Sequence, residues 1–336
     1  VIEHTTMPAT YVAGFFCIGE YMKILVTGGC GFIGSHFLRY MMKAYPDDSF
    51  ICLDALTYAG NKNNIADFLH RSQLTMAEGN IRDAIFVDAL FATYKPDIVV
   101  HFAAETHVDR SITGPQVFLE TNVIGTGILL DACLRHGIER FHHVSTDEVY
   151  GTLPLQGGSP FTEQSPLKPT SPYAASKASS DLLVLSYYKT YGLPVTISRC
   201  SNNYGTHQYP EKLIPLMIQK ALQGKPLPVY GDGLNVRDWI HVVDHCRAID
   251  YILQKGTVGE VYNIGAREEI SNIDMVKLML NVLGKPHGLI TYVPDRLGHD
   301  LRYAIDSSKL ETMGWRQEYT MEDTLTGIVE WYRKLL

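Results

Sequence analysis

The stretch Lys23-Ile24-Leu25-Val26-Thr27-Gly28-Gly29-Cys30-Gly31-Phe32-Ile33-Gly34 decides the fold. An apolar, β-branched run ends in closely spaced glycines and leads into a helical pattern that continues to residue 44. Glycines at such a turn let the backbone approach a pyrophosphate, whose charge is favoured at a helix N-terminus. A lone glycine motif is weak, but its place between a predicted strand and a predicted helix indicates a dinucleotide site.

Strands and helices alternate through the first 200 residues. Further strands are predicted at 50–54, 74–77, 98–103, 140–145 and 195–199, and helices at 84–94, 117–136 and 172–191. This order predicts the α/β class, with a doubly wound parallel sheet of Rossmann type. Beyond residue 200 prolines and glycines become frequent and the elements shorten. We therefore expect a dinucleotide-binding domain over 22–200 and a smaller mixed α/β substrate lobe over 201–336, with some segments crossing back.

The composition of the chain indicates which partners, metal sites and locations are not expected. The net charge of −7 gives no basic footprint, so nucleic acid is not expected as a partner. The six cysteines are scattered without metal-ligand spacing, which predicts a reducing cytoplasm and no metal. We expect no membrane segment, because no apolar run approaches the ~20 residues that a spanning helix needs. Residues 1–21 precede Met22-Lys23-Ile24, which resembles a natural start, and we treat them as an extension of unknown role.

Asp54 ends the second predicted strand. A carboxylate there would accept hydrogen bonds from a ribose 2′-hydroxyl and repel a 2′-phosphate, so the cofactor is expected to be NAD rather than NADP. Asn80 and Ile81 follow the third strand and are placed beside the adenine. Small residues at Ala103 and Ala104 would let the backbone pass close to the cofactor, although simple sheet packing explains them about equally well.

Tyr173 and Lys177 are four residues apart and share one face of a predicted helix. Tyrosine has a pKa of about 10, which a neighbouring ammonium and a positive nicotinamide ring would lower. The phenolate would take the proton of a sugar hydroxyl while hydride leaves for the ring. The pattern by itself is weak, and an incidental pair on an amphipathic helix is the alternative.

Thr146, Asp147 and Glu148 follow the fifth predicted strand at its carboxyl end, where open α/β sheets bind ligands. Strand alternation would direct Thr146 and Glu148 one way and Asp147 the other, unless the strand has ended and turned. A solvated acidic turn would be the default interpretation of this pair alone. Beside a tyrosine and a lysine, the two acids indicate that a proton and a hydroxyl are also moved.

Longer stretches of the chain carry a resemblance. They are GGCGFIGS (28–35), DALTYAGN (54–61), FAAETHVDRSI (102–112), STDEVYG (145–151), SPYAASKASSD (171–181), RCSNNYG (199–205), EKLIPL (211–216), PLPVYGDGLNVRDWIHVVDH (226–245) and PDRLGHDLRYAID (294–306). Together they resemble the extended short-chain dehydrogenase/reductase family, and within it the dTDP-glucose 4,6-dehydratases. The adjacent acids favour this branch, because epimerase relatives lack them.

The resemblance implies an NAD-dependent hydro-lyase that converts dTDP-glucose to dTDP-4-keto-6-deoxyglucose and water, as in dTDP-rhamnose and deoxysugar biosynthesis. Tyr173, with Thr146, would remove the C4 hydroxyl proton while hydride passes to NAD. Glu148 would then take the C5 proton while protonated Asp147 gives one to the departing C6 hydroxyl, and hydride would return to C6. The catalytic residues are therefore expected to be Thr146, Asp147, Glu148, Tyr173 and Lys177.

The resemblance also supplies binding residues and a homodimer built from a four-helix bundle of the helices near 117–136 and 173–191. Cofactor contacts are expected from Gly28, Gly31, Phe32, Ile33, Gly34, Asp54, Leu56, Thr57, Asn80, Ile81, Phe102, Ala103, Ala104, Thr106, Thr121, Tyr173, Lys177 and Asn203. Substrate contacts are expected from Thr106, Thr146, Asn202, Lys212, Leu213, Pro228, Tyr230, Arg237, Asn272, Arg296 and His299, the two arginines because guanidinium groups suit a pyrophosphate.

Four positions depart from the family pattern, and two other functions stay open. Cys30 replaces a common alanine, Thr106 a usual serine, and 205–208 reads Gly-Thr-His-Gln instead of Gly-Pro-Tyr-Gln, which puts the conformation of that loop in doubt. One alternative is another NAD-dependent sugar-nucleotide enzyme, such as an epimerase, a UDP-glucuronate decarboxylase or a dehydratase of another nucleotide. The other is a non-catalytic NAD-sensing module.

Overall fold

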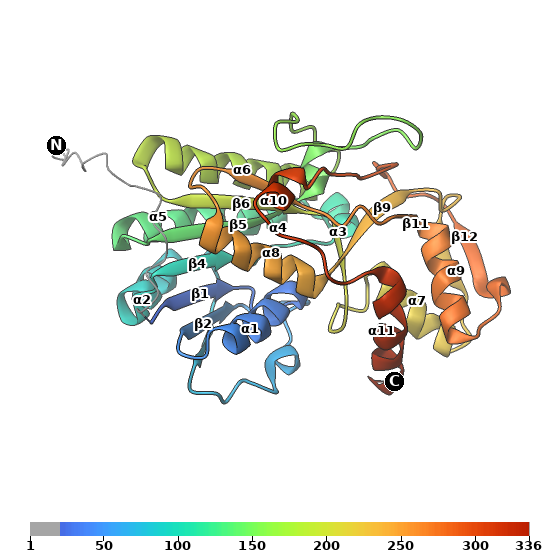
Figure 1. The fold of residues 1–336 in the computed structure, drawn as a ribbon, viewed down its shortest axis with the longest axis horizontal. Helices are drawn as coiled ribbons and strands as arrows, with labels where there is room; N and C mark the ends of the chain where they lie inside the picture. The colour runs from blue at the N-terminus through green and yellow to red at the C-terminus, as the bar shows by residue number, and fades with distance from the viewer. Residues whose placement is uncertain (1–20, 336) are drawn as a thin grey trace.

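A seven-stranded parallel sheet forms the centre of the protein in the computed structural model, which describes residues 21–335 (Figure 1). The strand order is β10-β6-β5-β4-β1-β2-β3. The strands are β1 (Lys23–Thr27), β2 (Ser49–Asp54), β3 (Leu74–Glu78), β4 (Ile98–His101), β5 (Arg140–Thr146), β6 (Val195–Cys200) and β10 (Val261–Ile264). The predicted doubly wound α/β fold is confirmed. Of the expected extension over 1–21, all but residue 21 lies outside the described residues.

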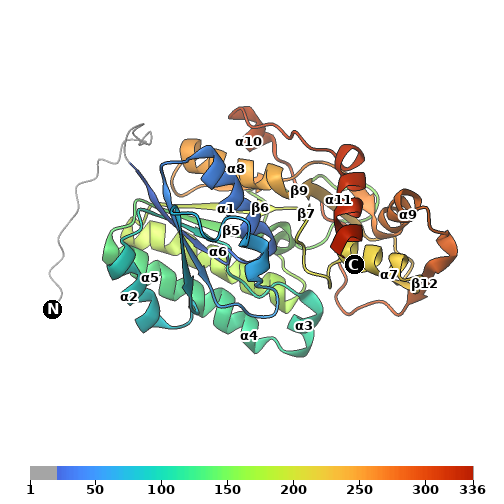
Figure 2. The ribbon, with the colours of Figure 1, turned by 90° about the horizontal axis from the view of Figure 1, so that it is seen from below.

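Helices cover both faces of this sheet (Figure 2). One face is covered by α1 (Phe32–Ala44) and α8 (Val242–Lys255), and the other by α2 (Ala84–Tyr94), α5 (Thr126–His136) and α6 (Pro172–Tyr191). Alternation along β1 divides the core: Val26 packs in the cluster of α1 and α8, whereas its neighbour Leu25 packs in the cluster on the opposite face. The inner strands β5 and β6 are buried along their whole length because helices cover both faces, although β5 also carries the buried polar residues Arg140, His142 and His143.

The helix predicted over 117–136 has three parts: α4 (Gln116–Phe118), a π-helical segment η2 (Leu119–Gly125) and α5. We expected no apolar run of the length that crosses a membrane, and the one helix of that length in the described part of the chain is interrupted by the charged residues Glu120 and Asp131. Among residues 21–335, one helix, Gln116–His136, is long and apolar enough to cross a membrane by length and composition alone. It reaches 21 residues because α4, η2 and α5 join end to end. Its α5 part packs in the core below the sheet, where Leu129 and Leu130 are fully buried, as expected of a core helix.

The smaller lobe has its own core between α7 (Leu213–Leu222), α9 (Asn272–Leu283) and α11 (Met321–Leu335). A two-stranded sheet of β8 (Leu227–Tyr230) and β12 (Ile290–Val293) belongs to it, and β7 (Asn202–Tyr204), β9 (Val236–His241) and β11 (Glu269–Ser271) form a three-stranded sheet beside it. Short elements complete the described chain: η1 (Lys62–Ile65), α3 (Val108–Thr113), η3 (Asp147–Tyr150), η4 (His287–Leu289) and α10 (Ser308–Thr312).

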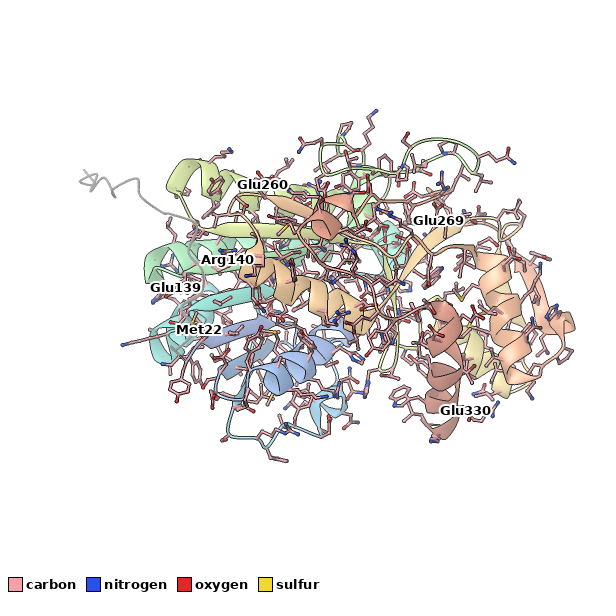
Figure 3. The ribbon with its side chains drawn as sticks, viewed as in Figure 1. Met22, Glu139, Arg140, Glu260, Glu269 and Glu330 are labelled. Carbon is pink, nitrogen blue, oxygen red and sulfur yellow. The ribbon has the colours of Figure 1, made fainter. Side chains whose placement is uncertain are left out.

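The chain returns to the large sheet after residue 200, since α8 and β10 both pack on it. A division into contiguous domains at residue 200 therefore stays a prediction, while these two elements cross back as expected. Figure 3 labels Met22 and Arg140 at the edge of the sheet where the strands begin, and Glu269 and Glu330 toward the smaller lobe. The carboxyl ends of the strands thus face that lobe.

Candidate active site

A cleft opens at the carboxyl edge of the sheet. Its walls come from the turn after β1, from the ends of β2, β4 and β5, from the first turns of α6, and from the loop between β7 and α7. Most of the predicted site residues line it: Gly28, Gly31, Phe32, Ile33, Gly34, Asp54, Thr57, Asn80, Ile81, Phe102, Ala103, Ala104, Thr106, Thr121, Thr146, Asp147, Glu148, Tyr173, Lys177, Asn202, Asn203 and Lys212.

The glycine turn fits a dinucleotide. Gly28 has a φ of +72°, and a Cβ on it would lie 2.7 Å from the backbone nitrogen of Ala103. A Cβ on Gly34 would lie 2.3 Å from the carbonyl oxygen of Gly28. No side chain caps α1, so its first backbone N–H groups remain available to a pyrophosphate. The turn therefore requires glycine at both positions and leaves donors for an anion.

Asp54 is held at the ribose end of the turn. Its Oδ2 accepts the backbone N–H of Cys30 at 2.9 Å, and its Oδ1 accepts that of Leu56 at 2.8 Å. A carboxylate oxygen has a second lone pair, so both oxygens can also accept a ribose hydroxyl. Leu56 itself does not line the cleft, and its contribution is the backbone N–H that orients Asp54.

Both acids enter the cleft because β5 ends at Thr146 and the 3₁₀ helix η3 begins at once. Strand alternation therefore does not apply here, and Asp147 and Glu148 line the same cavity. Thr146 joins them: its Oγ1 donates to Asp147 Oδ1 at 3.3 Å and accepts the backbone N–H of Glu148 at 3.3 Å. The turn thus gathers one hydroxyl and two carboxyl groups at a single point.

The two acids differ electrostatically. Burial raises the pKa of Asp147 well above its usual value, and the neighbouring charge of Glu148 raises it further. Burial also raises the pKa of Glu148, but Arg296, Arg237 and Lys212 oppose this by favouring its carboxylate. Asp147 is therefore suited to carry a proton and Glu148 to receive one.

Tyr173 and Lys177 occupy one face of α6, whose first turn is fixed by the Ser171 hydroxyl, which accepts the backbone N–H of Ala174 at 3.1 Å. We expected a neighbouring ammonium and the nicotinamide ring together to lower the pKa of Tyr173, and this stays a prediction. Among the protein groups alone, burial raises the pKa of Tyr173 and Thr146 lowers it. The Lys177 ammonium donates to the carbonyl of Val144 at 2.8 Å, and burial lowers its pKa to about 8.

A buried polar network lies behind Lys177, and we did not predict it from the sequence. His143 Nε2 lies 3.4 Å from Lys177 Nζ and 3.5 Å from Asp181 Oδ1, and Arg199 Nε donates to Asp181 Oδ2 at 2.8 Å. The side chains of His143 and Asp181 are completely buried. One signal was available: Asp181 follows Lys177 by the same four residues that separate Lys177 from Tyr173.

A second feature, of which only Lys212 was predicted, borders the cleft where three segments meet. Tyr209, Glu211 and Lys212 line the cleft, and Tyr58 and Arg110 contact them from outside the lining. The guanidinium of Arg110 lies 3.8 Å from the centre of the Tyr58 ring, and Tyr58 contacts Tyr209 edge to face with ring centres 5.5 Å apart. Arg110 also forms an ion pair with Glu211 at 3.7 Å, and Lys212 Nζ donates to the carbonyl of Thr106 at 3.2 Å. We call these five side chains, from Tyr58, Arg110, Tyr209, Glu211 and Lys212, the cover.

The remaining predicted substrate residues do not line the cleft. Arg237 is buried, with one nitrogen donating to the carbonyl of Asp300 at 3.0 Å and its guanidinium 4.2 Å from the Tyr303 ring centre. Arg296 pairs with Asp109 at 3.7 Å, and its charge and that of Arg237 still act on Glu148. The predicted substrate residues outside the lining are Leu213, Pro228, Tyr230, Arg237, Asn272, Arg296 and His299, and their roles stay predictions.

Comparison with known proteins finds one family model and several similar proteins that cover most of this chain. The family model of GDP-mannose 4,6 dehydratase matches residues 25–328. The low-salt glycan biosynthesis protein Agl12 of Haloferax volcanii is 51% identical over 93% of this chain and 98% of its own length. The dTDP-glucose 4,6-dehydratase of Streptomyces antibioticus is 49% identical over 93% and 92%. A crystal structure of DesIV, a dTDP-glucose 4,6-dehydratase of Streptomyces venezuelae with NAD bound, is 50% identical and superposes with a TM-score of 0.90 over 93% of this chain and 97% of that one.

Proposed function

The chain belongs to the family described as GDP-mannose 4,6 dehydratase, and we propose that within this family it is a dTDP-glucose 4,6-dehydratase. It is an NAD-dependent hydro-lyase that converts dTDP-glucose to dTDP-4-keto-6-deoxyglucose and water. One observation carries this assignment: Asp147 and Glu148 open into the same cleft as Tyr173 and Lys177. An enzyme that only oxidises or epimerises the sugar has no use for two further carboxyl groups there.

The glycine turn and Asp54 are the residues that would hold NAD, since the turn admits a pyrophosphate and Asp54 can accept ribose hydroxyls. Bound there, the cofactor supplies reversible hydride transfer, with hydride leaving C4 and returning to C6. Tyr173 takes the proton of the C4 hydroxyl, and Thr146 hydrogen-bonds the same oxygen. Lys177 holds its positive charge near the phenol and favours the phenolate.

Elimination follows because a C4 ketone acidifies the C5 proton. Glu148 takes this proton, and the three cations that act on its carboxylate favour its charged, basic form beforehand. Asp147, kept protonated by burial, gives its proton to the departing C6 hydroxyl. Each positioned proton transfer is worth roughly 10²–10⁴ in rate.

The assignment is tested by incubating the purified chain with dTDP-glucose and NAD and measuring the alkaline absorbance of the 4-keto product. UDP-glucose and GDP-mannose are the matched controls for the nucleotide. If no 4-keto product forms from dTDP-glucose, the assignment is contradicted and an NAD-sensing module is favoured. The variant Glu148→Gln tests the roles: it should still oxidise C4 but lose elimination by at least ~100-fold.

We propose a homodimer formed by helices 116–136 and α6. Ile124 is 57% exposed and Leu182 is 60% exposed, and Leu119 and Val117 are exposed beside Ile124 along the same helix. Apolar side chains gathered on two adjacent helices are expected to be covered by a second copy, giving a four-helix bundle. Light scattering should give a dimer mass, and a monomer mass for the intact chain would contradict the proposal.

The cytoplasm is the compartment that fits best. Within residues 21–335 the cysteines are all free and buried, and Cys30 and Cys52 keep their thiols 3.9 Å apart without a bond. Unbonded thiols at this separation are typical of a reducing environment. Fractionation of the native host cell would test this location.

A further inference from the structure

Three sulfur atoms meet directly behind the glycine turn. Cys52 on β2 and Met76 on β3 are register partners in the parallel sheet, so their side chains leave the same face of the sheet side by side. Cys30 contacts both of them from the turn, with its Sγ 3.9 Å from Cys52 Sγ and 3.9 Å from Met76 Sδ. The proposed reaction uses none of these three side chains.

The surrounding structure fixes the positions of the two thiols. Cys30 and Cys52 have no exposed surface, and the turn lies so close to Cys52 that a Cβ on Gly29 would be 2.5 Å from its Sγ. The backbone N–H of Cys30 donates to Asp54 Oδ2 at 2.9 Å, which holds the start of this side chain. Met76 is only half-buried and methionine side chains are flexible, so a small ion can reach the thiols past its thioether.

The spacing of the sulfurs suits a soft metal ion bound in a trigonal plane. With metal–sulfur bonds of about 2.3 Å, three sulfurs in such a plane lie about 4.0 Å apart, whereas two sulfurs on opposite sides of an ion lie about 4.6 Å apart. The two separations of 3.9 Å agree with the trigonal arrangement.

The kind of ligand favours copper(I). Thiolate and thioether sulfurs are soft ligands and select copper(I) over harder ions. Zinc prefers four ligands drawn from thiolates, imidazoles and carboxylates. Within residues 21–335 no group of three or more cysteines, histidines and acids is placed to hold a metal, so zinc is not expected at these sulfurs.

We propose that Cys30, Cys52 and Met76 bind one copper(I) ion. Both thiol S–H bonds break as two copper–sulfur bonds form, the two protons go to solvent, and the Met76 sulfur donates a lone pair as the third ligand. Nothing is oxidised or reduced. The proposal departs from our expectation of no metal, because cysteines 22 residues apart form no metal-ligand motif in the sequence.

The test offers copper(I) to the intact, reduced chain as its bicinchoninate complex, with ascorbate present and oxygen excluded. The unaltered chain is expected to remove one copper per chain from the coloured complex, and X-ray absorption at the copper edge should show three sulfur neighbours at about 2.3 Å. Met76→Leu, which keeps the approximate size and loses the sulfur, should show two. Cys30→Ala, which introduces the residue common in the family, should lose this copper. Cys133→Ala removes an equally buried thiol elsewhere and should bind as the unaltered chain does.

Three results would overturn the proposal. If the unaltered chain leaves the copper with bicinchoninate, or if Cys30→Ala takes it up equally well, the three sulfurs form only a packing contact. If Met76→Leu keeps three sulfur neighbours, Met76 is not a ligand. Cys52→Ser carries the same expectation as Cys30→Ala should that variant not fold. None of these measurements uses dTDP-glucose, so failure of the proposed enzymatic function would leave them unchanged.

Discussion

Replacing Asp181 by asparagine tests the buried network behind Lys177. The Asp181 side chain is 0% exposed and that of Arg199 is 4% exposed, and they are joined by a 2.8 Å hydrogen bond. Asp181→Asn leaves the guanidinium buried without a counter-charge. Breaking a buried pair in this way costs about 3–5 kcal/mol. At an unfolding entropy of about 2.1 cal/mol/K per residue, a loss of ~4 kcal/mol lowers the Tm of this chain by about 6 °C.

The same change should alter the pH dependence of oxidation. Burial lowers the pKa of Lys177 to about 8, and Asp181 is the charge that most opposes this fall. Without that charge the pKa of Lys177 falls further, and the lysine loses its proton at a lower pH. Lys177 favours the phenolate of Tyr173 when it is charged and not when it is a neutral amine. The alkaline fall in the rate of C4 oxidation should therefore move to lower pH in D181N.

Two control variants distinguish the loss of the Asp181 charge from a general loss of stability. The double variant Asp181→Asn with Arg199→Met removes both charges and should recover most of the lost stability, but not the pH profile. Glu260→Gln breaks the exposed pair with Lys309, at 2.8 Å, and should cost at most about 1 kcal/mol. A Tm for D181N within ~1 °C of the parent, measured by calorimetry, would refute the argument.

Two further outcomes are expected. Tyr58→Ala should loosen Tyr209 and Glu211, which line the cleft, and speed NAD release about 3- to 10-fold, because it removes the ring that contacts Tyr209 and on which Arg110 lies at 3.8 Å. Tyr58→Phe keeps the ring, and equal release from both variants would exclude this role. The free energy of unfolding should also fall steeply below pH 6.5. Burial holds the pKa near 3 for His36 and His245 and near 4 for His143, so these residues take up protons when the chain unfolds. Each of them lowers the free energy of unfolding by up to ~1.4 kcal/mol for each pH unit below 6.5. A free energy of unfolding from urea denaturation that stays constant between pH 6.5 and 4 would contradict this.

Local patterns were enough to place the elements of the large sheet. The predicted helices 32–44 and 84–94 have the bounds of α1 and α2, because glycine or aspartate precedes each and an apolar period fills it. The strand predicted over 98–103 is shorter, since β4 ends at His101. Beyond it the backbone comes so near the glycine turn that a Cβ on Gly28 would meet Ala103. That approach depends on two distant segments and has no local signal.

The candidate site was predictable in its parts and less so in its arrangement. Spacing on one helix was enough to pair Tyr173 with Lys177. The direction of Asp147 was left open, because alternation applies only while the strand continues, and β5 stops at Thr146. The network of His143, Asp181 and Arg199 joins α6 to two strands. Its contacts follow from the packing of α6 on β5 and β6, which no single segment of sequence encodes.

The unusual loop 205–208 shows how a departure from the family pattern can leave the chemistry intact. The Thr206 carbonyl accepts a hydrogen bond from His36 on α1 at 3.0 Å, and the His207 ring packs against Trp331 of α11, so the altered residues are half-buried and fasten the loop between these two helices. Gln208, which matches the family pattern, lines the cleft. Its side chain donates to the carbonyl of Asn203 at 3.1 Å, and its backbone N–H donates to the hydroxyl of Tyr332 at 3.1 Å. Because Asn203 and Gln208 both line the cleft, the loop still closes it. Substitution of Thr206 or His207 is therefore expected to change how firmly the smaller lobe is attached, while the proton-transferring groups on β5, η3 and α6 stay in place.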